Sequence, residues 1–343
     1  MGWDRIRGHE LVRRQLEAAW KRGRLGHAYL FAGPEGVGKA LFARELARAL
    51  LCEAKADRLE ACDRCPACRQ VDAGTHPDFF TAGRPEDKLE LPIEVVRELA
   101  GHLALRPARG GHKVAILDDA DDLNEASANC FLKTLEEPPL GSVLILIGRD
   151  PERQLPTIVS RCQVVRFAPL PAAVVDAVLA EQGVADPAQR ERFVRLAGGS
   201  VGQALALNDP ELWAFRGTLL EAVAADRPDL FALGRRWMEF VEEAGKDAAA
   251  QRGRASLVLR LLIELLQSAL RLALGAEVNI PDPQERARLE RLAGRLGPDR
   301  LLAWLERCFE ADRHIDRRVQ LVLAVEALAD ALGQAEPAAR VPR

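Results

Sequence analysis

The segment that most constrains the fold is a glycine-rich loop, Gly33–Lys39, set between two apolar stretches. The apolar run over 27–32 predicts a buried strand, and the pattern over 41–51 predicts a helix. This order is the context of a phosphate-binding loop, whose inward N–H groups cradle phosphate oxygens while the lysine adds a positive charge. The glycines that allow this backbone are Gly33, Gly36 and Gly38.

The residue after the lysine departs from this motif. A Ser or Thr there would bind magnesium, whereas Ala40 has no oxygen to offer. Asp118 and Asp119 follow an apolar strand expected over 113–117, where the acids of a nucleotide site belong. Asp118 is a candidate magnesium ligand through water, and Asp119 is one methylene shorter than the Glu that usually polarises an attacking water. Two interpretations stay open: a site that binds ATP or ADP with impaired magnesium binding, and a vestigial cradle.

Four cysteines follow the predicted loop helix within one short segment: Cys52, Cys62, Cys65 and Cys68. Four thiolates can close a tetrahedron around zinc with no open position, so we expect a structural zinc site. The alternatives are four free thiols and an iron–sulfur cluster. The further spaced cysteine of a ferredoxin run is missing, which disfavours the cluster.

Length and charge bound the function. A chain of 343 residues is long enough for two or three domains, and a net charge of −3 argues against tight nucleic-acid binding by this chain alone. The N-terminus shows no apolar signal region, which predicts a cytoplasmic protein without a membrane partner. The apolar stretch 257–274 carries polar residues along one helical face, so we expect a buried bundle helix with one solvent-facing stripe. That stripe consists of Arg260, Glu264, Gln267 and Arg271.

Strand-like and helical segments alternate in the first half of the chain, which predicts a parallel-sheet α/β domain. The expected strands, besides those above, are 78–81, 142–148 and 163–167, and the expected helices are 4–23, 93–105 and 126–135. The pattern then becomes entirely helical, with breaks expected near 227–228, 281–283 and 297–298. The predicted parts are an α/β domain over 1–168 with the cysteine insertion at about 52–68, a small helical domain over 169–208, an all-helical domain over 209–333 and a disordered tail over 334–343.

Two further motifs complete a recognisable set. The run Leu132–Pro139 reads Leu-Lys-Thr-Leu-Glu-Glu-Pro-Pro, and Ser160-Arg161-Cys162 lies at the edge of the predicted α/β domain. With the glycine loop and the four cysteines, these motifs resemble the AAA+ clamp-loader subunits of bacterial DNA polymerase III. The resemblance implies an AAA+ domain with a zinc module, a small helical lid domain and a helical collar that oligomerises. It also implies that Arg161, by itself an ordinary surface arginine, is an arginine finger supplied to a neighbour's ATP site.

The family contains two kinds of subunit with these motifs, the ATP-hydrolysing gamma or tau motor and the delta-prime stator. Three departures favour the stator type: Ala40, Gly148-Arg149 in place of the motor's sensor threonines, and Gly199–Gly202 in place of a Gly-Ser-x-Arg sensor. The resemblance then implies a hetero-oligomer with gamma/tau and delta that loads a sliding clamp onto primed DNA. This chain's own ATPase activity would be weak or absent, and polymerase activity would reside elsewhere in the holoenzyme.

Two alternatives from other classes are kept. One is an ATP-hydrolysing motor subunit or a stand-alone AAA+ ATPase, which hydrolysis by the purified chain would favour. The other is a zinc-containing nucleic-acid binder that retained the fold, which salt-sensitive binding of primed DNA by the lone chain would favour.

Overall fold

The computed structural model describes residues 2–54, 57–85, 88, 90–109, 111–280, 282–317 and 319–334. The chain forms two compact units, Met1–Ala206 and Leu207–Arg343. Gln334, the first residue of the predicted tail, is the last residue of a helix, and the rest of that tail, 335–343, lies outside the described residues.

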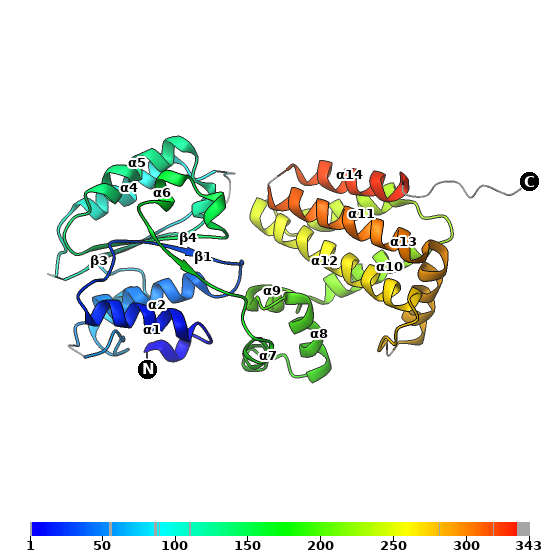
Figure 1. Cartoon of the computed structure of the whole chain (residues 1–343), viewed down its shortest axis with the longest axis horizontal. Coiled ribbons are helices and arrows are strands. Elements are labelled where there is room, and N and C mark those ends of the chain that lie inside the picture. The colour runs from blue at the N-terminus through cyan, green and yellow to red at the C-terminus, as the bar shows by residue number, and fades with distance from the viewer. Residues whose placement is uncertain are drawn as a thin grey trace, which may run out of the picture. The chain divides into compact units, whose positions relative to one another are not determined.

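Five parallel strands form the sheet in the described part of the first unit, in the order β2-β3-β4-β1-β5 (Figure 1). They are β1 (Ala28–Ala32), β2 (Phe79–Ala82), β3 (Lys113–Leu117), β4 (Ser142–Gly148) and β5 (Gln163–Arg166). Each lies within a residue or two of the stretch that the sequence predicted. Strands β1, β3 and β4 are buried throughout because helices cover both faces of the sheet, which explains their continuous apolar sequences.

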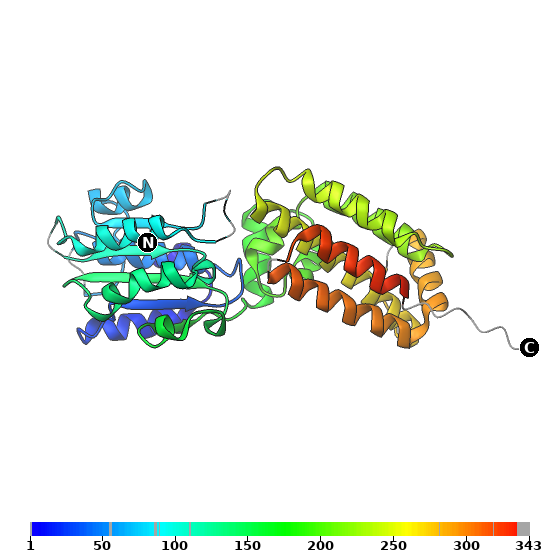
Figure 2. The ribbon, with the colours of Figure 1, turned by 90° about the horizontal axis from the view of Figure 1, so that it is seen from above.

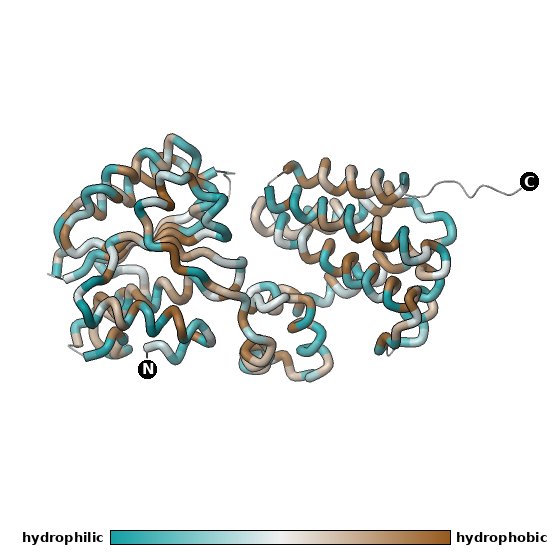
Figure 3. The backbone as a smooth tube through the Cα atoms, viewed as in Figure 1, coloured by the Kyte–Doolittle hydropathy of each residue, from teal (hydrophilic) through white to brown (hydrophobic). Residues whose placement is uncertain are grey.

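Helices cover both faces of this sheet, with α1 and α2 on one and α4 and α5 on the other (Figure 1). Successive side chains of β1 point to opposite faces of the sheet. Tyr29 and Phe31 pack toward α1 and α2, and Leu30 packs toward α4 and α5. Figure 3 shows hydrophobic residues concentrated along the strands between these layers. The helices of this unit are α1 (Glu10–Lys21), α2 (Lys39–Leu51), α3 (Pro66–Asp72), α4 (Ile93–Ala104), α5 (Glu125–Glu136), α6 (Pro156–Val159), α7 (Ala172–Glu181), α8 (Pro187–Ala197) and α9 (Val201–Ala206), with short 3₁₀ turns at Gly2–Arg5, Ala120–Asp122 and Pro151–Arg153.

Because the strands are parallel, their carboxyl ends lie along one side of the sheet, called the carboxyl edge below, and their amino ends lie along the opposite side, called the amino edge. Ala32 of β1 pairs with Gly148 of β4, so the residues that follow these strands lie at one edge, the carboxyl edge. In doubly wound sheets, ligands bind in the crevice outside this edge. Tyr29 pairs with Gln163, the first residue of β5, so the residues that precede β5 lie toward the opposite, amino edge.

The prediction of one helix over 4–23 is wrong for residues 4–9. The chain instead forms a 3₁₀ turn at Gly2–Arg5 and starts α1 only at Glu10. Gly8 and His9 separate them with φ angles of 80° and 61°, in the left-handed region that a helix cannot include. Leu170 packs so closely on Gly8 that a β-carbon there would lie 2.5 Å from Cδ2 of that leucine, so the break serves a tertiary contact.

The secondary-structure elements in the described part of the second unit are all helices, and α14 runs along α13 in it (Figure 2). Its helices are α10 (Pro210–Ala224), α11 (Leu230–Glu242), α12 (Ala248–Ala273), α13 (Pro283–Asp316) and α14 (Leu321–Gln334). The breaks expected near 227–228 and 297–298 are present, the latter as a kink at Gly297, whose φ is 68°. The break between α11 and α12 was not predicted.

The solvent-facing stripe predicted on α12 is wrong at Glu264. This carboxylate is 9% exposed and accepts a hydrogen bond of 2.9 Å from Nε of Arg216 on α10, whose Nη2 also donates to Glu285. Gln267 and Arg271 of the same stripe are exposed, as expected. A buried, paired charge therefore interrupts the apolar face of α12. In the part of the chain that the structure describes, none of the helices combines the length and the hydropathy of a membrane span.

Candidate functional site

The glycine loop lies at the carboxyl edge of the sheet, between β1 and α2, as predicted. Gly33 packs closely against Phe167, the residue that follows β5. A β-carbon on Gly33 would lie 2.2 Å from the carbonyl oxygen of Phe167. Gly36 has a φ of 73°, which side chains rarely tolerate. The loop is also braced by the ring of His9, whose Nε2 lies 2.8 Å from the carbonyl oxygen of Val37. These contacts fix a cradle-shaped backbone at the N-terminus of α2.

The Lys39 side chain turns back onto its own loop. Its Nζ donates to the carbonyl oxygens of Gly33 at 2.6 Å and Pro34 at 2.7 Å, and the residue is 7% exposed. Burial lowers the pKa of Lys39, and the nearby carboxylate of Asp118 opposes this effect. A cation held here without full hydration is available to an oxyanion such as phosphate.

Two further side chains named in the sequence analysis, Asp118 and Arg149, lie at the same edge. Asp118 follows β3, its Oδ1 accepts the N–H of Asp119 at 2.9 Å, and burial raises the pKa of its carboxyl. Arg149 follows β4, and its guanidinium forms an ion pair with Glu35 of the glycine loop. The sequence did not predict this pair, since its partners lie 114 residues apart and meet only because β4 is hydrogen-bonded to β1.

The beginning of α9 lies directly on the glycine loop. The Ser200 hydroxyl donates to the carbonyl oxygen of Glu35 at 2.8 Å, and the Gly202 N–H donates to that of Gly36 at 3.0 Å. This is the segment that resembles a Gly-Ser-x-Arg sensor with its arginine replaced. Here it binds the loop through its backbone and a hydroxyl, with no charged side chain at position 202.

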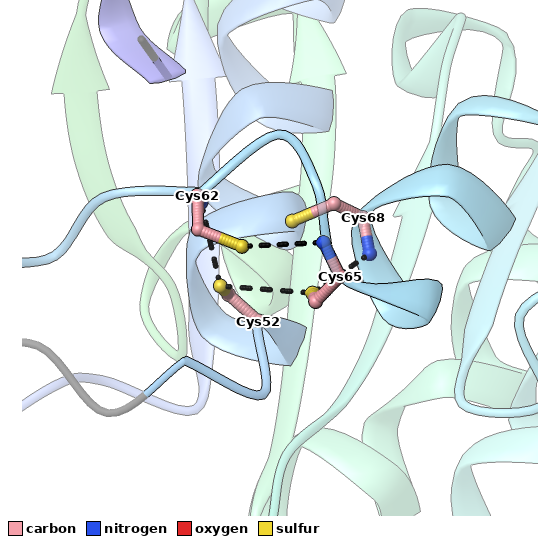
Figure 4. Close-up of side chains that lie close together, drawn as sticks. All are labelled: Cys52, Cys62, Cys65 and Cys68. Carbon is pink, nitrogen blue, oxygen red and sulfur yellow. Dashed lines mark hydrogen bonds between the residues drawn. The ribbon is translucent and has the colours of Figure 1, made fainter.

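The four predicted cysteines converge, as Figure 4 shows. All four Sγ atoms lie within 4.8 Å of one another, and those of Cys52 and Cys65 are 3.9 Å apart. Tetrahedral zinc–thiolate bonds of about 2.3 Å would separate the sulfurs by about 3.8 Å, so this donor set fits a structural zinc ion. The N–H groups of Cys62, Cys65 and Cys68 each point at a cluster sulfur at 3.4 Å. The cluster could therefore hold a metal ion.

The thiols of this cluster differ in acidity. Backbone N–H groups, that of Arg64 above all, lower the pKa of Cys62 to about 6. Burial raises the pKa of Cys52 and of Cys68, the one fully buried member of the four. Binding of a metal cation would favour the thiolate form of all four.

An ion network centred on a buried arginine, which the sequence did not predict, connects this cysteine segment to α2. The Arg48 side chain has no exposed surface and donates to Glu45 at 2.7 Å and to Asp63, the residue after Cys62, at 2.5 Å. Its Nε lies 3.1 Å from Asp72 at the end of α3. Arg48 thus connects the phosphate-loop helix with both ends of the segment that carries Cys62, Cys65 and Cys68.

Arg161 follows α6 and lies before β5, toward the amino edge of the sheet. Its side chain is 33% exposed, and its Nη2 donates to the carboxylate of Glu136 at 2.6 Å. Arg161 is therefore not part of the constellation around Lys39 and Asp118. Its position lies at the other end of the strands that carry the glycine loop.

The chain is similar to known proteins. The family model described as "DNA polymerase III, delta subunit" matches residues 8–171. The chain is 34% identical to DNA polymerase III subunit delta' of Escherichia coli over 85% of its own length and 83% of the relative's. The chain belongs to the delta-prime family of DNA polymerase III clamp-loader subunits.

Two other relatives, one of each subunit type, match a shorter part of this chain. Subunit delta' of Pseudomonas aeruginosa is 38% identical over 60% of this chain and 64% of the relative. Subunit tau of Escherichia coli is 34% identical over 64% of this chain, which covers only 34% of tau. Delta-prime proteins therefore match this chain along more of their own length than tau does.

Proposed function

We propose that the chain acts as the delta-prime stator of a clamp loader, assembled with gamma/tau and delta subunits and helping to load a sliding clamp onto primed DNA. Its own part would be structural, with one catalytic group, Arg161, supplied to a neighbouring ATPase subunit. The proposal rests on the family and on the position of this arginine.

The observation that carries it is the separation of Arg161 from this chain's own phosphate loop. Gln163 pairs with Tyr29 at one end of β1, and the glycine loop leaves the other end after Ala32. At roughly 3.3 Å per residue, the paired segment alone spans about 10 Å. A partly exposed guanidinium on the amino edge can therefore act on a γ-phosphate only if that phosphate belongs to another chain.

The chemistry suits such a role. A guanidinium aimed at a γ-phosphate stabilises the charge that develops in phosphoryl transfer, and such fingers are worth about 10³-fold or more in rate. This chain's own loop lacks the magnesium-binding hydroxyl at Ala40 but keeps Lys39 near Asp118. We therefore assign to it ATP or ADP binding without efficient turnover.

The remaining parts of the proposal concern assembly. We assign a structural zinc ion to the four cysteines, an AAA+ lid role to 169–208 and a collar role to 209–333. Two large apolar side chains, Leu302 and Phe309, are 49% and 45% exposed on α13 and seven residues apart, which puts them on one helical face. Such a face supports subunit packing in a collar.

The test is ATP hydrolysis by a loader reconstituted with its gamma/tau and delta partners, stimulated by primed DNA and clamp. Replacing this chain by an Arg161→Ala variant is expected to lower the rate by more than tenfold while the complex still elutes intact from a size-exclusion column. Arg153→Ala, at an exposed arginine in the 3₁₀ turn Pro151–Arg153 that precedes α6, is the control and should retain most of the rate. An unchanged rate with Arg161→Ala would overturn the finger.

One observation favours the second candidate, an active ATPase. Lys39 and Asp118, the charged residues of a hydrolytic site, lie close enough at the carboxyl edge for their charges to interact. Steady-state hydrolysis by the purified chain decides between the two. A turnover that Lys39→Ala abolishes would establish the active ATPase, and its absence leaves the stator.

A further inference from the structure

We propose that Glu136 is the positioning residue of Arg161: it holds the guanidinium in the orientation in which the finger meets a neighbour's phosphate. This inference deepens the proposed function and depends on it for its catalytic consequence. Its structural part, the control of Arg161 by Glu136, stands on this chain's own geometry.

The guanidinium is held along two of its edges. One carboxylate oxygen, Oε1 of Glu136, accepts from Nε at 3.1 Å and from Nη2 at 2.6 Å. Nη1 donates to the carbonyl oxygen of Thr157 at 3.0 Å and to the hydroxyl of Ser160 at 3.2 Å. Four of the five N–H groups of the side chain thus have acceptors within the described part of the chain. Within these residues the second N–H of Nη2 has no acceptor, so it is left for an incoming oxygen.

The acceptors belong to anchored backbone. Glu136 is the last residue of α5, and the N–H of Glu137 caps the helix by donating to the Lys133 carbonyl. Leu135, one residue earlier, is 3% exposed, and its carbonyl oxygen lies 3.1 Å from Nε2 of His27, the residue before β1. The carboxylate therefore sits on a helix end that is attached to the core of the sheet.

The other acceptors come from the turn that carries Arg161. Ser160 is the C-cap of α6, its hydroxyl donates to the Thr157 carbonyl, and the Arg161 N–H donates to the Ile158 carbonyl at 3.1 Å. Ile158 is fully buried, which fixes this turn against the core formed by α4 and α5. Glu136 is the one charged member of the set, so it is the contact that opposes the swing of the long side chain into solvent.

The pairing explains why a carboxylate lies beside an arginine meant for phosphate. An arginine side chain has many rotamers, and holding its planar fork before docking reduces the freedom lost when it meets an oxyanion. The carboxylate does not prevent Arg161 from binding a phosphate, because its single oxygen Oε1 accepts only from Nε and from one N–H of Nη2. Glu136 also follows Leu135 in the Leu-Lys-Thr-Leu-Glu-Glu-Pro-Pro run, which the sequence singled out without giving its glutamates a role.

The catalytic test uses the reconstituted loader with Glu136→Ala, Glu137→Ala, Arg161→Ala and the double variant Glu136→Ala/Arg161→Ala. Glu137 is the adjacent exposed carboxylate and the matched control. Glu136→Ala is expected to lower kcat about three- to fivefold with KM for ATP unchanged, and Glu137→Ala to leave both unchanged. The double variant should be no slower than Arg161→Ala, because the carboxylate acts through the arginine.

The second measurement needs neither partners nor ATP. Phenylglyoxal modifies accessible, unpaired arginines, and the modification of Arg161 in the full chain can be followed by peptide mass spectrometry. Arg161 should react several-fold faster in Glu136→Ala than in the wild type or Glu137→Ala. Equal modification rates, or effects of Glu136→Ala and Arg161→Ala on kcat that multiply, would overturn the inference. A wild-type rate in Arg161→Ala would instead overturn the finger, and the modification rates would then decide the pairing alone.

Discussion

Gly36 and Gly202 touch backbone to backbone. The Gly202 N–H donates to the Gly36 carbonyl oxygen at 3.0 Å, and a β-carbon on Gly202 would lie 2.9 Å from the Gly36 Cα. The start of α9 can rest on the phosphate loop at this distance only because neither residue has a side chain. Glycine at position 202 is thus a packing requirement of this chain.

Gly202→Ala should therefore separate α9 from the loop. We expect the free energy of unfolding of the first unit to fall by about 1–3 kcal/mol, the usual cost of overpacking. Gly101→Ala is the matched control, because Gly101 lies in α4 with open space around its Cα and should gain about 0.5–1 kcal/mol. Urea unfolding followed by hydrogen exchange of the sheet measures both. Equal effects would contradict the contact.

Arg48 offers a sharper test of the ion network that it centres. Arg48→Ala would leave the Glu45 carboxylate, 2% exposed, without its partner, and such broken buried pairs cost about 3–5 kcal/mol. Arg44→Ala, one turn earlier on the exposed side of α2, should stay within about 0.5 kcal/mol of the wild type. Chemical denaturation of the two variants compares them. If Arg48→Ala were as mild as Arg44→Ala, the network would not be what attaches the cysteine segment to α2.

Metal removal should act locally. The cysteine segment is inserted between α2 and β2 and contributes no strand to the sheet, so chelation is expected to expose 57–78 while β1 and β4 stay protected. Hydrogen exchange before and after chelator treatment measures this. Cys68→Ala should reproduce the chelated pattern without chelator, and Cys130→Ala, at a cysteine outside the cluster, should respond to chelator as the wild type does. Collapse of protection in β1 and β4 would contradict an insertion that folds separately.

The strands and the glycine loop could be predicted because their causes are local. A strand covered on both faces needs a continuous apolar run, and β4 has the same limits, 142–148, that its sequence predicts. The phosphate-binding loop likewise depends on glycines within one short segment. The four cysteines could be predicted to form one cluster because of their residue type and their close spacing.

What the sequence could not give are the pairs formed across the fold. Glu264 was assigned to a solvent-facing stripe from the helical period alone, and that period carries no information about Arg216 on another helix. Glu136 and Arg161 stand in two motifs that the sequence did single out, yet their contact depends on how α5 and α6 end against the sheet. Local pattern fixes which face of an element is apolar, whereas the partner of each charge depends on tertiary packing.

Asp118 should make the stability of this chain depend on pH in a defined direction. Burial raises the pKa of its carboxyl, so the folded state binds this proton more tightly than the unfolded state. The contribution of Asp118 to the free energy of unfolding therefore grows as pH falls through its folded pKa toward its ordinary value, and it is smallest at neutral pH. Between about pH 7 and about pH 4, the wild type should gain stability relative to Asp118→Asn. A difference that stays constant or changes in the opposite direction would contradict the burial argument.

Ala40 gives the last prediction, on nucleotide binding. It lies exposed in the first turn of α2, beside Lys39, so a threonine fits there and would supply the hydroxyl that binds magnesium in a phosphate loop. The affinity of the purified wild-type chain for a fluorescent ATP analogue should change little between magnesium and chelator. In Ala40→Thr, magnesium should tighten binding by about tenfold, or about 1.4 kcal/mol, and Lys39→Ala should abolish binding in both backgrounds. An equal magnesium effect in the wild type would mean that another oxygen replaces the hydroxyl, and no binding by any variant would make the cradle vestigial.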